Sequence, residues 1–211
     1  DHNAMIDPST TDITARVVEA LCRSGHERSS AAVRGGIRFL LREQEPDGSW
    51  YGRWGCNYLY GTFLAMGALE VAGSGDAERE AIARGAEWIR SVQNPDGGWG
   101  ESPESYRDPS LKGVGPSTPS QTAWALLGLL STGDRDSESV RRGVEYLLAT
   151  QQFNGEWRDE SWTGTGFPEV FYLKYHLYAT YFPVFALELW QQRQEKRTSD
   201  EATDGPRPVE F

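Results

Sequence analysis

Gln93-Asn94-Pro95-Asp96-Gly97-Gly98-Trp99 joins a glutamine to a tryptophan through a turn rich in proline and glycine. Similar segments run from Gln44 to Trp50 and from Gln151 to Trp157. Glycine tolerates the left-handed backbone that ends many helices, and proline cannot continue a helix. Each segment is therefore typical of a helix end followed by a chain reversal, and three copies indicate a repeat architecture.

Each copy follows a helix-like segment in which an aromatic residue lies five positions before the glutamine. These segments begin at Arg34-Gly35, Arg84-Gly85 and Arg142-Gly143. The glutamine amide offers two donors and one acceptor, so we expect it to bond the free N-terminal donors of the next helix. We also expect the indole face to stack on this amide. Each glutamine-to-tryptophan unit is called a clasp below, numbered from one to three in chain order.

The overall composition excludes several classes of protein. The chain has 211 residues, enough to bury roughly 70 % of its unfolded surface as one domain. The net charge of −10 argues against nucleic acid as a partner. Cys22 and Cys56 lie in unrelated surroundings, so we expect a reducing compartment and no disulfide. The three scattered histidines show no paired ligand spacing, so we expect neither a metal nor another cofactor.

Two further expectations concern membranes. No run of eighteen apolar residues is present, so we expect no transmembrane helix, and the N-terminus does not have the pattern of a signal peptide.

Hydrophobic periodicity predicts helices separated by glycine-rich breaks. The expected helices cover about residues 11–23, 30–44, 58–71, 76–93, 121–130, 137–151 and 183–194. We expect loops over residues 100–119 and 162–168, and the first is long enough to be either functional or disordered. The charged, proline-containing end of the chain predicts an ordered domain over residues 1–194 and a disordered tail over residues 195–211.

The helices alternate between apolar and more charged sequences, in about four pairs with a period near fifty residues. Paired helices with such a period form either an α-solenoid or an α/α toroid. The toroid is favoured because the inner helices are too apolar to line an exposed concave surface. Four pairs do not close a ring of six, so we expect at least one open edge.

Several segments resemble known enzymes. The repeat [KR]-G-x-x-[FYW]-[LIV]-x-x-x-Q-x-x-x-G-x-W resembles that of the triterpene cyclase family. The C-terminal half of squalene–hopene cyclases has segments similar to Trp54-Gly55-Cys56-Asn57-Tyr58-Leu59-Tyr60-Gly61-Thr62, Ser117-Thr118-Pro119-Ser120-Gln121-Thr122-Ala123-Trp124 and Gly164-Thr165-Gly166-Phe167-Pro168. The similarity extends from about Asp7 to Gln191. It implies an all-α fold, part of an α6/α6 barrel, and an enzyme that cyclises squalene or a related linear triterpene.

The resemblance also implies which residues form the active site. In this family an aspartate protonates a terminal alkene, and the chain cyclises through carbocations that aromatic rings stabilise. The matching aromatic positions near the cavity are Trp99, Phe167, Phe171, Tyr172, Tyr175 and Tyr178. Tyr106 matches a tyrosine that supports the acid, and Cys56 lies near a position that contacts it. From spacing alone, residues 167–182 would be core; Trp50, Trp99 and Trp157 are expected clasp residues, and Trp99 alone is expected to face the cavity as well.

One departure affects the mechanism. The family's acid motif, D-x-D-D, does not occur in this sequence, and Asp134-Arg135-Asp136 lies in an expected surface turn and lacks the fourth position's carboxylate. We therefore expect the acid to lie in the remainder of a longer cyclase chain, and this chain to be inactive alone. The alternatives are a non-catalytic α/α-toroid binding module and a subunit of another toroid enzyme, such as a prenyltransferase.

The resemblance implies further partners. Peripheral contact with the cytoplasmic side of a membrane and assembly into a homodimer are expectations of this kind, and nucleic acid is not an expected partner.

Overall fold

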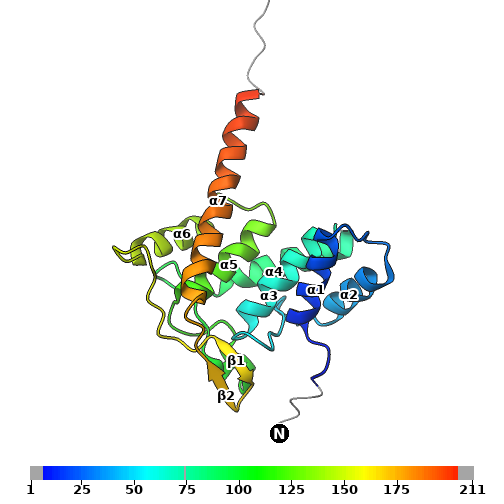
Figure 1. Ribbon diagram of the computed structural model, residues 1–211, viewed down its shortest axis with the longest axis horizontal. Coiled ribbons are helices and arrows are strands. Elements are labelled where there is room, and N and C mark those ends of the chain that lie inside the picture. The colour runs from blue at the N-terminus through cyan, green and yellow to red at the C-terminus, as the bar shows by residue number, and fades with distance from the viewer. Residues whose placement is uncertain (1–6, 74, 204–211) are drawn as a thin grey trace, which may run out of the picture.

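The computed structural model describes residues 7–73 and 75–203, with side chains described up to Lys196. The described residues are mostly helical, as the sequence predicts (Figure 1). The helices and strands, in chain order, are α1 (Thr11–Arg23), α2 (Ala31–Arg42), α3 (Tyr58–Val71), α4 (Asp76–Ser91), α5 (Pro119–Ser131), α6 (Glu138–Thr150), β1 (Gly164–Phe167), β2 (Phe171–Leu173) and α7 (Tyr178–Thr203).

The helices form an inner row and an outer row. In the inner row α1 packs on α3, α3 on α5, and α5 on α7, while α2, α4 and α6 each pack outside the inner helix that precedes them. Helices α3 and α5 are apolar on all sides and almost entirely buried, whereas the outer helices bury one stripe and expose charged residues. Three pairs and the seventh helix thus form an arc of an α/α toroid (Figure 1).

The three clasps share one hydrogen bond that the sequence analysis did not predict. The indole N–H of Trp50, Trp99 and Trp157 donates to the carbonyl ten residues earlier, at 2.7 Å in each case. That carbonyl lies in the last turn of the preceding outer helix, and those of Ile89 and Leu147 also accept a backbone N–H, from Val92 and Gln151. The tryptophan therefore ties the end of its helix to the turn that follows.

The prediction that the clasp glutamine bonds helix-end N–H groups is wrong, because its amide nitrogen donates to carbonyls instead. Gln44, Gln93 and Gln151 use Nε2 to donate to the carbonyl of the glycine four residues later. In clasps one and two the same nitrogen also donates to a carbonyl of the next outer helix. The amide therefore acts as a donor to that helix and not as an acceptor of its N-terminal N–H groups. Helix-end donors are therefore not the partners of these side chains.

Two loop predictions need refinement. The segment after clasp two is ordered and contains the 3₁₀ turns Pro103–Tyr106 and Pro109–Leu111. The glycine-rich segment before Pro168 is not a loop, because β1 and β2 pair as an antiparallel hairpin with a bulge between Thr165 and Phe167. Helix α7 begins at Tyr178, five residues before the expected start at residue 183.

The end of the chain also differs from the prediction. Helix α7 contains Pro183 in its second turn rather than starting there, and it continues to Thr203. Helix α7 thus extends past residue 194, where we expect the domain to end, and residues 204–211 lie outside the described residues. Glutamate, glutamine, lysine and arginine favour helix, and the Gln191–Glu195 side-chain bond adds an i,i+4 contact. Among the described helices, none has both the length and the apolar character needed to cross a bilayer.

Candidate active site

The β1–β2 hairpin presents two aromatic rings. The rings of Phe167 and Phe171 meet edge to face at 5.4 Å between centroids, and 43 % of Phe171 is exposed. Gly166 makes this arrangement possible, because a β-carbon at that position would overlap the Phe171 ring. In the Gly-Thr-Gly-Phe strand, Gly166 thus leaves space for the ring of Phe171 on the paired strand.

A buried arginine contacts strand β1 of the hairpin. Arg53 donates to the Gly166 carbonyl at 3.1 Å, and its guanidinium lies 5.4 Å from the centre of the Phe167 ring. Its own backbone N–H donates to the Asp12 carboxylate at 2.9 Å. The contact with Phe167 shows that this ring already holds a cation against its face. Sequence reasoning missed Arg53, since a single arginine in a glycine-rich segment carries no signal of burial.

Tyr106 joins the hairpin to the segment before α3. Its hydroxyl lies 2.8 Å from the Gly52 carbonyl, 2.9 Å from the Gly55 carbonyl and 2.9 Å from the Thr165 hydroxyl. Its ring stacks on Tyr172, with 5.9 Å between centroids and 23° between the planes. Burial raises the pKa of the Tyr106 phenol well above its usual value, so this group stays protonated and donates.

A buried carboxyl group lies beneath Tyr106. One oxygen of Glu101 accepts from the backbone N–H of Asn57 at 3.3 Å and of Leu59 at 2.9 Å, at the start of α3. Burial raises the pKa of this carboxyl, although the backbone hydrogen bonds lower it in part. Cys56 is completely buried beside it, with Sγ 3.5 Å from the Glu101 carbonyl oxygen, and burial raises the pKa of its thiol. The sequence analysis did not identify Glu101.

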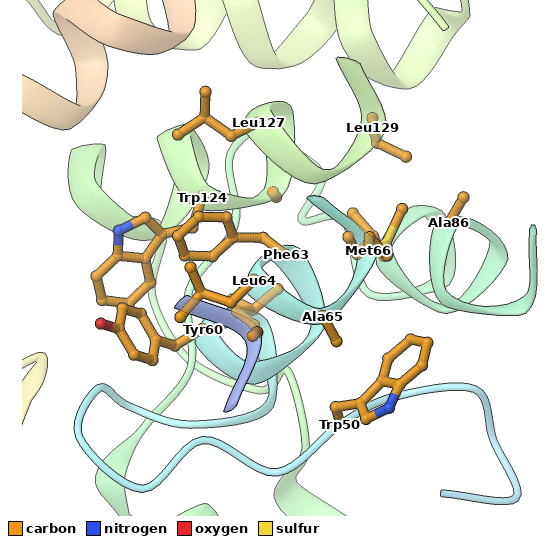
Figure 2. Close-up of a cluster of buried hydrophobic side chains, with 14 of the residues drawn as sticks. Trp50, Tyr60, Phe63, Leu64, Ala65, Met66, Ala86, Trp124, Leu127 and Leu129 are labelled. Carbon is orange, nitrogen blue, oxygen red and sulfur yellow. The ribbon is translucent and has the colours of Figure 1, made fainter. Parts of the chain in front are cut away.

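The inner helices supply a second group of rings. Tyr60 and Phe63 of α3 meet Trp124 of α5, with Tyr60 and Trp124 4.8 Å apart (Figure 2). Trp124 then contacts Tyr178 of α7 at 5.8 Å, and Tyr178 contacts Tyr175 at 4.8 Å. Tyr60, Phe63 and Trp124 are themselves buried in the hydrophobic core, and the sequence of an apolar helix does not distinguish them from other core residues.

Glycines connect the two groups of rings. Tyr60 packs on Gly55, whose carbonyl faces the Tyr106 hydroxyl, and Tyr175 packs on Gly164 of β1. The rings therefore form one connected cluster, which we call the aromatic wall; Tyr60, Phe63 and Trp124 are buried in the core, and Phe171 and Tyr175 are exposed. Its members are Tyr60, Phe63, Tyr106, Trp124, Phe167, Phe171, Tyr172, Tyr175 and Tyr178. The guanidinium of Arg16 lies 5.9 Å from the centre of the Phe63 ring, a second cation held at an aromatic face.

Trp99 lies outside the aromatic wall. It has no exposed area, and its indole packs beside Gly143 and Leu126 in clasp two. The structure thus brings together six of the eight expected site residues, with Cys56 buried beneath them and Trp99 in the scaffold.

The acidic turn at Asp134 has a structural role. Its carboxylate pairs with Arg90 of α4 at 2.7 Å. Burial alone would raise the pKa of Asp134, but hydrogen bonds from Arg90 and Ser137 lower it overall. Within residues 7–73 and 75–203, no cluster of histidine, cysteine and acidic side chains is suited to a metal ion.

Comparison with known proteins identifies the family. Residues 1–192 match the model of the squalene-hopene cyclase C-terminal domain. A squalene–hopene cyclase from Bradyrhizobium diazoefficiens is 50 % identical over 89 % of this chain, and one from Alicyclobacillus acidocaldarius is 47 % identical over 93 %. A dammaradiene synthase from Dryopteris crassirhizoma is 47 % identical over 92 %. The chain spans only 28 %, 31 % and 31 % of these three relatives, respectively.

Solved structures agree on the fold. A type II terpene cyclase from Scytonema, in complex with merosterolic acid A, aligns with 88 % of this chain and 54 % of its own, with a TM-score of 0.63 and 21 % identity. An ent-copalyl diphosphate synthase from Streptomyces platensis aligns with 89 % of this chain and 33 % of its own, with a TM-score of 0.59 and 24 % identity.

Proposed function

The chain belongs to the squalene–hopene cyclase family, and on this premise we propose that it supplies the aromatic wall of a cavity in which a linear triterpene such as squalene is cyclised. The chain is the C-terminal part of a longer catalytic unit. The observation that carries this proposal is the continuity of the wall across α3, α5, α7 and the hairpin.

The wall suits the chemistry of a hydrocarbon cation. Such an intermediate has no counter-ion in an apolar cavity, so the ring faces must stabilise its charge, at about 0.5–2 kcal/mol each. Phe171 and Tyr175 are each 43 % exposed and offer ring surface that a substrate can cover. Phe167, Tyr172 and Tyr178 are partly buried and extend this surface.

The residues beneath the wall have positioning roles in this proposal. Tyr106 fixes the hairpin against the segment before α3, and Glu101 and Cys56 hold the start of that helix. We assign Trp99 to the scaffold rather than to the cavity. The aspartate that protonates the alkene comes from the remainder of the polypeptide, which is the chain's principal partner.

The proposed substrate also suggests a cellular location. Squalene is a hydrocarbon that partitions from water into lipid. We therefore place the complete enzyme in peripheral contact with the cytoplasmic face of a membrane.

Product analysis tests the proposal. The complete polypeptide encoded by the gene and the isolated 211-residue chain are each incubated with squalene, and the products are separated by gas chromatography. We expect polycyclic products from the complete polypeptide and none from the isolated chain. No cyclised product from a folded complete polypeptide would refute the proposed function, and products from the isolated chain would refute the assignment of the acid to another segment.

A further inference from the structure

Clasps one and two are each closed by the outer helix that follows them. Gln44 Nε2 donates to the Ala81 carbonyl of α4 at 2.8 Å, and Gln93 Nε2 donates to the Ser139 carbonyl of α6 at 2.9 Å. Three residues later, each helix carries an arginine that returns a bond to the clasp. Arg84 donates to Gln44 Oε1, and Arg142 donates to the carbonyls of Asn94 at 3.0 Å and Pro95 at 2.7 Å.

The clasp glycines fit against the same helices. A β-carbon on Gly48 would lie 2.6 Å from the Arg84 carbonyl oxygen, and one on Gly97 would lie 2.7 Å from that of Arg142. The residue after each arginine is Gly85 or Gly143, against which the indole of the clasp tryptophan packs. A closed clasp therefore involves an arginine, a small residue after it and a helix carbonyl three positions before it that accepts a second hydrogen bond, from the glutamine.

Clasp three has the same internal structure, but within residues 7–73 and 75–203 no outer helix closes it. Gln151 Nε2 donates to the Gly155 carbonyl at 3.0 Å, and among the described residues this nitrogen has no bond to a following helix. A β-carbon on Gly155 would meet nothing within 4 Å, and Phe153 at the tip of the turn is 110 % exposed. The outer helix α6, which leads into clasp three, exposes Leu148.

A cavity of about 430 Å³ lies between clasp three and the start of α7, lined by side chains that include Trp157, Lys174 and His176. Its wall is mixed in polarity, unlike a surface suited to the interior of a bilayer.

We infer that clasp three is a docking site for an α-helix from the part of the polypeptide beyond this chain. That helix carries an arginine whose guanidinium reaches the carbonyls of Gln152 and Phe153, the counterparts of Asn94 and Pro95. A small residue follows the arginine, and the carbonyl three positions before it accepts from Gln151 Nε2. This inference rests on the proposed function, because it names the contact that holds the remaining polypeptide against the wall-bearing arc.

A second copy of this chain fits the site less well. The outer helix at the other end of the arc is α2, which the sequence analysis aligned through Arg34-Gly35. The bonds of the tryptophans to Leu40, Ile89 and Leu147 correct this alignment by one residue. Gly35, not Arg34, therefore occupies the position of Arg84 and Arg142, so α2 lacks the required guanidinium there. A helix from elsewhere in a longer polypeptide is the better candidate, because this chain covers only 28–31 % of the length of its relatives.

The test compares Gln→Ala substitutions at clasps two and three in two forms of the protein. In the isolated chain, Gln93→Ala removes two side-chain hydrogen bonds and Gln151→Ala removes one. We expect the denaturant midpoint to fall by at most half as much for Gln151→Ala as for Gln93→Ala. In the complete polypeptide we expect the two falls to be equal within error.

Hydrogen exchange locates the effect. Amides of residues 152–157 should exchange faster than those of residues 94–99 in the isolated chain and become equally slow in the complete polypeptide. Fast exchange of residues 152–157 in the complete polypeptide, or a Gln151→Ala effect that stays small there, overturns the inference. A dimer of the isolated chain that Gln151→Ala disrupts would also overturn it, by showing a second copy as the occupant. None of these measurements uses squalene, so a failure here is distinct from a failure of the proposed function.

Discussion

The clasps and the aromatic wall use the same residue types for opposite purposes. In the clasps, Trp50 and Trp99 have no exposed surface, and the indole N–H of each donates to a carbonyl in the last turn of a helix. In the wall, Phe171 and Tyr175 keep part of their rings uncovered. An aromatic ring anchored on all sides contributes stability, whereas a ring with a free face remains available to a substrate. The predictions below test this division.

The largest expected effect is at a clasp. Trp99→Ala should lower the free energy of unfolding by about 3–5 kcal/mol, because it removes a fully buried ring and leaves a cavity in the scaffold. Urea unfolding of the isolated chain followed by circular dichroism measures this loss. A midpoint within error of the wild type would show that the clasp does not hold the helices together.

The next effect concerns the hairpin. Gly166→Ala should cost about 1–3 kcal/mol, because the new methyl group would overlap the Phe171 ring. The matched control is Gly35→Ala, a helical glycine with nothing within 4 Å of an added β-carbon, which should stabilise by about 0.5–1 kcal/mol. Thermal unfolding of both variants gives the comparison. Equal effects would mean that Phe171 does not pack over Gly166.

The sequence revealed the scaffold more completely than the site. The clasp repeat and the alternation of apolar and charged helices predict the toroid, because turns and buried stripes leave a periodic pattern. The wall depends on contacts between residues far apart in sequence, such as Tyr106 with Gly52 and Thr165. The resemblance supplied Phe167, Phe171 and Tyr175, but no spacing rule distinguishes Tyr60 or Trp124 from ordinary core residues. The hairpin was missed because β1 and β2 are only four and three residues long.

A pH effect should separate Glu101 from the surface carboxylates. Its folded pKa is raised above the ordinary 4.5, so its contribution to stability is fully present below that value and is lost as pH rises through the folded pKa. Glu101→Gln does not titrate, and its free energy of unfolding relative to the wild type should therefore rise from about pH 4 to about pH 7.

Asp134→Asn is the matched control for Glu101. The pKa of Asp134 is lowered, so the stabilising effect of its carboxylate is present at neutral pH and is lost as pH falls through the folded pKa. Unfolding curves from about pH 2 to about pH 7 should show opposite trends for the two variants, with the change for Asp134→Asn occurring below the ordinary pKa of 3.8. A parallel trend would contradict the burial of the Glu101 carboxyl.

The smallest expected effect on stability is at the wall. Phe171→Ala should change the free energy of unfolding by less than about 1 kcal/mol, because the ring is 43 % exposed and lies in a short hairpin. The same urea experiment as for Trp99→Ala measures it. A loss as large as that of Trp99→Ala would place Phe171 in the scaffold.

The division between scaffold and wall is tested most directly by the products of the complete polypeptide. Squalene is supplied to the wild type and to the Phe171→Ala, Phe171→Tyr and Trp99→Phe variants, and the products are separated by gas chromatography. We expect Phe171→Ala to release products with fewer rings, Phe171→Tyr to retain the wild-type product, and Trp99→Phe to lower the yield with the product ratio unchanged. A wild-type product spectrum at reduced yield from Phe171→Ala would contradict the account, because Phe171 would then serve only packing.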